Sequence, residues 1–279
     1  MMYKKAPPGW SYIDPNPFTP DGSYELGWSS FCILDRDDDQ FMTGRIGTGP
    51  FSARFGRRVK HLEVRLIDFL RYENGQGRIV ILSFPGDMDI DQYIEEAQSK
   101  VPGPNVVRPD DPKIVVHSTT LEAWKKIRTD GQLKSAAELS RSSFQPVRII
   151  ESSSEVGRYL TDEPPEYSDY IMFGTITSTT PEKIVASYQA GRFVLDDNAI
   201  YEPGVRLYFD NQRMIRDDLI VRDGLHTTKV YKRLPLSAYL LAAIGVNDVD
   251  PCQEVKTWTL QSFMERADNL FFSSGQRPT

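Results

Sequence analysis

The sequence predicts an α+β fold, and three features of the chain support this prediction. Short apolar or β-branched runs bounded by turn residues indicate strands, and capped amphipathic segments indicate helices. Strands and helices do not alternate regularly, as they would in a doubly wound sheet. Pairs such as Asn74-Gly75 and Asp223-Gly224 add turn and hairpin signals. We therefore expect a mixed or antiparallel sheet with flanking helices.

The N-terminal part contains fewer clear elements than the C-terminal part. Proline, glycine and aspartate dominate residues 1–24, which we expect to be irregular. The segment His61–Tyr72 mixes helical and strand periods, although its length favours a helix. The clearer elements are strands at Trp28–Leu34 and Arg78–Phe84 and a capped helix at Asp89–Ser99. Residues 101–112 form a natural linker, so we expect an accessory domain at 1–110 and a second domain at 111–279.

The second domain opens with a β-branched strand from Ile114 and an amphipathic helix. Thr120 is placed to cap the helix Leu121–Asp130, and Gly131 suits the left-handed position after it. Trp124 and Ile127 share one helical face and should pack on the sheet. The remaining expected elements are strands at Arg158–Thr161, Tyr170–Thr175 and Val205–Phe209, helices at Pro181–Ala190, Leu236–Ala243 and Thr257–Ala267, and hairpin arms at Asp218–Arg222 and His226–Tyr231.

The composition is that of an ordinary globular protein, with 39% hydrophobic and 26% charged residues among 279. No apolar run approaches the roughly 18 residues that a membrane-spanning helix needs. The N-terminus lacks the apolar core of a secretory signal, and Cys32 and Cys252 resemble neither a disulfide framework nor a metal knuckle. We expect a cytoplasmic protein that does not enter membranes.

Charge is unevenly distributed along the chain, whose formal net charge is −6. The acidic balance argues against broad, non-specific binding to nucleic-acid backbones. Even so, Arg54–Arg65 is strongly basic, whereas Asp35–Asp39 and Glu163–Asp169 are acidic. This segregation is compatible with a nucleotide or nucleic-acid groove on one face of the protein. The simpler interpretation is two solvated faces.

His117 is the main candidate for chemistry. It lies at the end of the Ile114 strand and is followed by Ser118, Thr119 and Thr120, where the strand opens into a helix. An imidazole and several hydroxyls at such a turn can hold a ribose diol or an amide through hydrogen bonds. A lone histidine at a strand end is, however, more often structural than catalytic.

Two segments of the chain resemble a known family. The pattern H-S-T-x-x-x-A-W-x-x-I-x-x-x-G-x-L begins at His117, and a second block spans Val205–Leu240. In this order they resemble the NAD-dependent RNA 2′-phosphotransferases, members of the ADP-ribosyltransferase superfamily. The resemblance implies a split mixed or antiparallel sheet and NAD as cofactor. That family's N-terminal basic motif is not evident in residues 1–110, where Arg57-Arg58 and Lys60-His61 do not reproduce it.

The resemblance also implies roles for individual residues. His117, Ser118 and Thr119 would hold the nicotinamide-side ribose, and Arg222 would bind a phosphate or stabilise charge. Arg158 and Tyr159 belong to a segment like one that lines the cofactor pocket, where Tyr159 would stack on nicotinamide.

An acidic partner is expected because ADP-ribosyl transfer passes through an oxocarbenium-like sugar. Glu202, just before Pro203-Gly204 and the next strand, is the best-placed carboxylate by order, although it equally suits a solvated loop. Weaker candidates are the carboxylates Glu151 and Glu155, and phosphate-binding candidates are Arg148, Arg158, Arg206 and Arg222.

These observations predict NAD-dependent ADP-ribosyl transfer to a nucleic-acid or nucleotide acceptor, either RNA or DNA, with His117, Glu202 and Arg222 as catalytic residues. The alternatives are an RNA 2′-phosphotransferase with a replaced N-terminal module, and a non-catalytic module that binds NAD or a nucleotide. A metal-dependent hydrolase using Asp35, Asp37 and Asp39 is a third class. We expect no metal site, because this acidic run lacks the pattern of a calcium loop.

Overall fold

The computed structural model describes residues 1–25, 27–142 and 164–275, which fold into two compact units. The first unit includes Met1–Gly103 and the short segment Arg222–Leu225. The second unit contains most of the chain from Pro104 onward. Both combine helices and sheets, so the protein is α+β. Within the described ranges, no helix has the length and apolar character needed to cross a bilayer.

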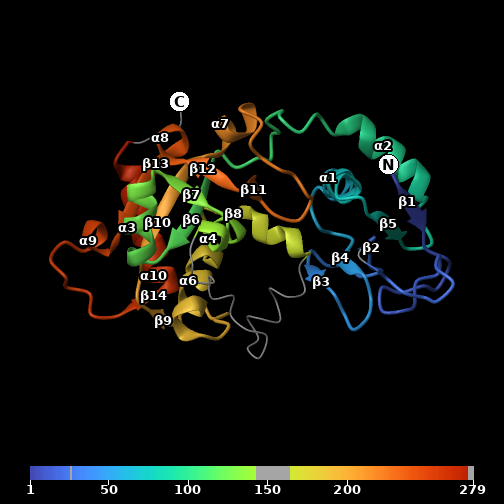
Figure 1. Ribbon diagram of the computed structural model, residues 1–279, viewed down its shortest axis with the longest axis horizontal. Helices are drawn as coiled ribbons and strands as arrows, with labels where there is room; N and C mark the ends of the chain where they lie inside the picture. The colour runs from blue at the N-terminus through green and yellow to red at the C-terminus, as the bar shows by residue number, and fades with distance from the viewer. Residues whose placement is uncertain (26, 143–163, 276–279) are drawn as a thin grey trace. The chain divides into compact units, whose positions relative to one another are not determined.

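The first unit is built on a largely parallel sheet with the strand order β1-β5-β2-β4-β3 (Figure 1). All neighbouring pairs in it are parallel except β3 with β4. Helices α1 and α2 pack on each other, and α1 also contacts β5 and β2. The elements are β1 Tyr3–Lys5, β2 Trp28–Ile33, β3 Phe41–Gly44, β4 Phe51–Phe55, α1 Leu62–Gly75, β5 Ile79–Ser83 and α2 Ile90–Lys100.

Burial on both faces explains this parallel sheet. Every residue of β4 is buried, as are all but the first of β2, so the alternating pattern that reveals a one-sided strand is absent. The ring of Phe31 stacks on Phe55, with centroids 4.6 Å apart, and lies 5.6 Å from Phe69 of α1. The segment His61–Tyr72 is thus helical, as its length favours, and its apolar side closes this core.

The second unit is built on an antiparallel sheet with the strand order β11-β8-β6-β10-β13. Short pairs β12–β7 and β14–β9 lie beside it. The elements are β6 Ile114–Thr119, α3 Leu121–Asp130, β7 Gln132–Lys134, α4 Ala136–Ser142, η1 Pro165–Asp169, β8 Tyr170–Thr175, α6 Thr180–Ala190, β9 Ile200–Tyr201, β10 Val205–Asp210, α7 Asn211–Arg216, β11 Thr228–Tyr231, β12 Arg233–Pro235, α8 Leu236–Tyr239, β13 Leu240–Gly245, α9 Val246–Val249, β14 Trp258–Thr259 and α10 Leu260–Ser273.

Hydrophobic clusters cover both faces of this sheet. One cluster joins Leu207 and Phe209 to α7, and Trp124 and Ile127 of α3 pack against it, as predicted. The opposite cluster joins Tyr208 to α10, where the rings of Tyr208 and Phe271 stack 4.3 Å apart. Alternate residues of β10 therefore point into different cores, which is the period expected of a strand covered on both sides.

The ends of α3 are those that the sequence predicts. The Thr120 side chain accepts a hydrogen bond from the Ala123 N–H, and Gly131 follows the helix with a φ of 68°. A side chain at this left-handed position would be strained, whereas glycine adopts it readily. The capped α3 helix therefore begins at Leu121, two residues after β6 ends at Thr119.

Two expected elements of the second unit are wrong. The expected helix Leu236–Ala243 is helical only to Tyr239, because the apolar run from Leu240 becomes β13 and pairs with β10. The expected hairpin around Asp223-Gly224 is reduced to an isolated bridge between Ile220 and Val230, and β11 pairs instead with β8. In both cases a partner strand distant in sequence decides the outcome, which no local pattern reports.

Candidate functional site

The ring of His117 occupies the place where β6 and β8 stop pairing. The ladder between these strands contains Val115 with Thr175 and Val116 with Gly174, and it ends before His117. On its other side β6 pairs with β10 along its whole length, from Ile114 to Thr119. The end of β6 that carries His117 is thus anchored to β10, with no ladder partner in β8.

A backbone carbonyl orients the imidazole. Nδ1 of His117 lies 3.1 Å from the carbonyl oxygen of Met172, and the ring is tilted against Phe173 with centroids 5.9 Å apart. Because a carbonyl only accepts hydrogen bonds, Nδ1 carries the proton and donates it. Nε2 of the neutral ring is therefore an acceptor, which suits a bound hydroxyl.

Burial lowers the pKa of His117, and the hydrogen bond to the Met172 carbonyl opposes this effect only partly. The neutral imidazole is consequently the form present at physiological pH. Such a ring can accept a hydrogen bond from a ribose hydroxyl or take up a proton during a reaction.

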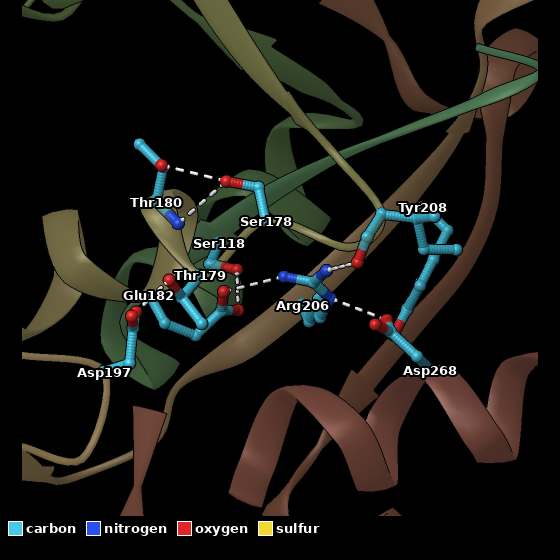
Figure 2. A network of polar contacts seen from close by, with 10 residues as sticks. Ser118, Ser178, Thr179, Thr180, Glu182, Asp197, Arg206, Tyr208 and Asp268 are labelled. Carbon is cyan, nitrogen blue, oxygen red and sulfur yellow. Dashed lines mark hydrogen bonds and ion pairs between the residues drawn. The ribbon is translucent and has the colours of Figure 1, made fainter. Parts of the chain in front are cut away.

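Ser118 faces away from His117, although we expected them to act together. Its hydroxyl donates to Oε1 of Glu182 at 2.5 Å, on the side of the sheet that α6 covers (Figure 2). Successive side chains of a strand point to opposite faces, so His117 and Thr119 share one face and Ser118 the other. The hydroxyl of Ser118 is thus engaged with Glu182, where it anchors β6 to α6, and the structure does not bring it together with His117.

Arg206 is the centre of the buried network to which Ser118 belongs (Figure 2). Its guanidinium, completely buried, donates to Glu182 at 2.7 Å, to Asp268 at 2.9 Å and to the carbonyl of Ile176 at 2.6 Å. The hydroxyl of Tyr208 also donates to Asp268, at 2.8 Å. The network joins β6, β10, α6 and α10 by charge-assisted bonds. Its geometry leaves Arg206 no role as a phosphate ligand.

The charges of this network depend on one another. Burial raises the pKa of Glu182 and of Asp268, and the guanidinium between them partly offsets that rise. Burial disfavours the charge on Arg206, but the two carboxylates together outweigh it and raise its pKa. Ion pairs buried to this extent are costly to break, since the remaining partner keeps an uncompensated charge. The sequence contains no local signal for Glu182 or Asp268, which lie on helices far apart in the chain.

Glu202 lies in the exposed loop before β10. Its backbone N–H and carbonyl bond to the side chain of Gln189, the carbonyl at 2.7 Å. Two residues on, Gly204 lies so close to Thr119 that a Cβ there would be 1.8 Å from the Thr119 carbonyl oxygen. Glu202 thus lies at the same end of the β6–β10 pair as Thr119, as the order of elements predicts.

The structure does not place the other expected site residues relative to His117. Arg222 belongs to the first unit, whereas His117 belongs to the second. Arg158 and Tyr159 lie outside the described residues, as do Glu151, Glu155 and Arg148. His226 packs edge-on against the ring of Tyr167, with centroids 5.4 Å apart.

Comparisons with known proteins provide no further identification. A scan against protein-family models and searches of curated proteins and of solved structures find no significant match.

The acidic and basic segments of the first unit pair with each other. Arg57 contacts Asp35 at 2.9 Å, and Arg58 contacts Asp37 at 3.3 Å. The expectation of separate charged faces is therefore wrong for these residues. In the described part of the chain, no group of three or more histidine, cysteine, aspartate or glutamate side chains is arranged to hold a metal ion.

Proposed function

We propose that the second unit binds NAD at the end of β6 and transfers its ADP-ribose to a nucleic-acid or nucleotide acceptor. One observation carries most of the weight. The two segments that resemble the ADP-ribosyltransferase superfamily are distant in sequence, yet β6 and β10 pair from Ile114–Asp210 to Thr119–Val205. Segments that share one functional origin are expected to meet in space, and these do.

His117 and Thr119 are the proposed ribose ligands, because they lie on the same face of β6. Nε2 of His117 accepts a hydrogen bond from a ribose hydroxyl, and the Thr119 hydroxyl can donate or accept a second one. The Met172 carbonyl holds the imidazole in the required tautomer. Ser118, on the other face, contributes by fixing the strand.

In the reaction, the bond between the nicotinamide nitrogen and the ribose C1′ breaks, and its electron pair leaves with nicotinamide. The acceptor oxygen or nitrogen then forms a bond to C1′ and loses its proton. A carboxylate stabilises the oxocarbenium-like sugar and can take that proton. Glu202 is the proposed carboxylate, since its loop lies at the Thr119 end of the strand pair.

Two alternative functions can be distinguished by the same experiment. A 2′-phosphotransferase would consume NAD only with 2′-phosphorylated RNA, and a regulatory module would bind NAD without breaking its glycosidic bond. The cytoplasmic setting remains an expectation from composition.

The test is to incubate the full chain with NAD and with RNA or DNA, and to measure released nicotinamide and the thermal melting temperature. We expect His117→Ala and Glu202→Gln to lower nicotinamide release. Lys126→Ala is the matched control, because Lys126 is exposed on α3 and pairs with Glu122 at 3.0 Å.

Each outcome is decisive. A ligand at 100 times its dissociation constant stabilises a protein by about 2.7 kcal/mol, so binding is detectable without turnover. A melting shift that His117→Ala abolishes, with no nicotinamide released, favours the regulatory module. If the wild-type chain shows no melting shift with NAD and releases no nicotinamide, the NAD-dependent function is ruled out.

A further inference from the structure

A basic hollow on the first unit has no role in the proposed NAD reaction. It encloses about 600 Å³ and lies between the segment after β4 and strand β3. Its lining includes Asp39, Phe41, Arg58, Lys60, His61 and Arg65. The lining thus contains three arginine and lysine side chains and one carboxylate, and Asp37 pairs with Arg58 at 3.3 Å.

The position of the hollow in the sheet is that of a ligand site. Strands β2, β4 and β5 are parallel, so their carboxyl ends lie at one edge of the sheet. The loop after β4 leaves that edge and enters α1, and Arg58, Lys60 and His61 lie in this loop. In open sheets of this kind ligands bind outside the carboxyl ends of the strands, and helix N-termini attract anions.

Ion pairs hold Arg57 in this loop, whereas Arg58 remains mostly exposed to solvent. Arg57 contacts Asp87, after β5, at 2.7 Å as well as Asp35. The Arg58 side chain stays 66% exposed, although it pairs with Asp37. Cations that remain in solvent at the rim of a hollow can exchange such a weak surface pair for a phosphate.

An aromatic surface accompanies the charge. Phe41 on the edge strand β3 is 44% exposed, and the guanidinium of Arg65 lies over its ring at 5.2 Å. Aromatic rings and guanidinium planes are the surfaces on which unpaired nucleobases stack. The ring of Phe41 also stacks on Phe55 with centroids 5.7 Å apart, so a base would contact the exposed part of Phe41 and the guanidinium plane of Arg65 together.

The conformation of His61 adds a strained residue to the same hollow. Its φ is 58°, which side-chain-bearing residues rarely adopt, and its side chain makes no capping bond to α1. Strain of this kind persists where the surrounding structure imposes it, and it is concentrated at functional sites.

We propose that this hollow binds single-stranded nucleic acid, with the phosphate backbone along Arg58, Lys60 and Arg65 and a base against Phe41. Asp39 and, in the first turn of α1, Glu63 oppose the charge of the site and limit its affinity. The proposal is independent of NAD, because its test contains none.

The test measures binding of a short fluorescent oligouridylate to the full chain by anisotropy, over a range of salt concentrations. The affinity should fall with salt, with a slope of about −0.7 for each phosphate contacted. We expect Arg58→Glu combined with Lys60→Glu to weaken binding about tenfold or more. Phe41→Ala should weaken it about fivefold or more while leaving the salt slope unchanged.

The matched control is Lys125→Glu combined with Lys126→Glu on α3, which changes the net charge equally at exposed positions. It should leave the affinity within about twofold of the wild-type value. Equal weakening by both double variants would reduce the effect to overall charge and overturn the proposal. So would binding of UMP or inorganic phosphate as tight as that of the oligomer, or no binding by a wild-type chain that melts cooperatively.

Discussion

At the scale of single residues, the lowered pKa of His117 makes the stability of the protein depend on pH. The residue is half-buried, and desolvation of its ring lowers its pKa below the ordinary value of 6.5. The unfolded chain therefore binds a proton at a pH where the native ring does not. Its neutral form contributes fully to stability above the unfolded pKa, and that contribution is lost as the pH falls from there toward the folded value.

We predict that the free energy of unfolding decreases when the pH falls below about 6.5, and that His117→Gln reduces this dependence. The glutamine amide can still donate to the Met172 carbonyl but does not titrate. Urea unfolding at a series of pH values measures the slope for each protein. Identical slopes for the two proteins would contradict the proposed burial of the neutral ring.

Arg206 has a structural role, because its fully buried guanidinium pairs with two carboxylates. We predict that Arg206→Ala lowers the free energy of unfolding by about 3–5 kcal/mol, since it leaves Glu182 and Asp268 buried without their cation. Lys126→Ala breaks an exposed pair on α3 and should have little effect. Chemical denaturation compares them, and similar losses would refute the structural role.

At the scale of elements, the turn from β6 into α3 depends on local capping. We predict that Thr120→Ala destabilises the protein by about 1 kcal/mol, because the Ala123 N–H loses its acceptor. Thr129→Ala is the control: that hydroxyl donates to the carbonyl of Lys125 in its own helix, and its loss should matter less. Thermal melting measures both variants. An unchanged melting temperature for Thr120→Ala would show that packing alone holds the turn.

Several elements follow directly from their sequences. The helix Leu121–Asp130, its cap and its terminating glycine are as predicted, and so is the strand Tyr170–Thr175. Amphipathic period and capping are local properties, so a short window contains the information. The segment Leu236–Ala243 is different, because an apolar run suits a helix and a strand equally and only pairing with β10 decides.

At the scale of the whole molecule, the chain returns to its first unit late in the sequence. Gly224, with a φ of 73°, lies against Arg65, whose carbonyl oxygen would be 2.1 Å from an added Cβ. Nη1 of Arg65 also donates to the Gly224 carbonyl at 2.9 Å. The segment Arg222–Leu225 therefore belongs to the first unit, and the stability of this unit depends on residues that lie far along the chain from Met1–Gly103.

We predict that Gly224→Ala destabilises the first unit, since both its positive φ and the contact with Arg65 exclude a methyl group. The matched control is Gly75→Ala at the end of α1, where a Cβ would meet nothing within 4 Å. This control should be neutral or stabilising by up to about 1 kcal/mol. Hydrogen exchange of the β2 and β5 amides compares the two variants, and unchanged protection in Gly224→Ala would refute the contact.

The sequence by itself determined the α+β class, the ends of α3, the strands β2, β5, β6, β8 and β10, and the position of His117 at a strand end. These depend on hydrophobic period, capping and turn chemistry, which act over a few residues. Only the tertiary structure decided that Ser118 faces away from His117, that Arg206 lies buried between Glu182 and Asp268, and that Arg58, Lys60 and Phe41 surround one hollow. The reason is physical: these relations are made by partners distant in the chain, and burial and pairing energies depend on where those partners meet.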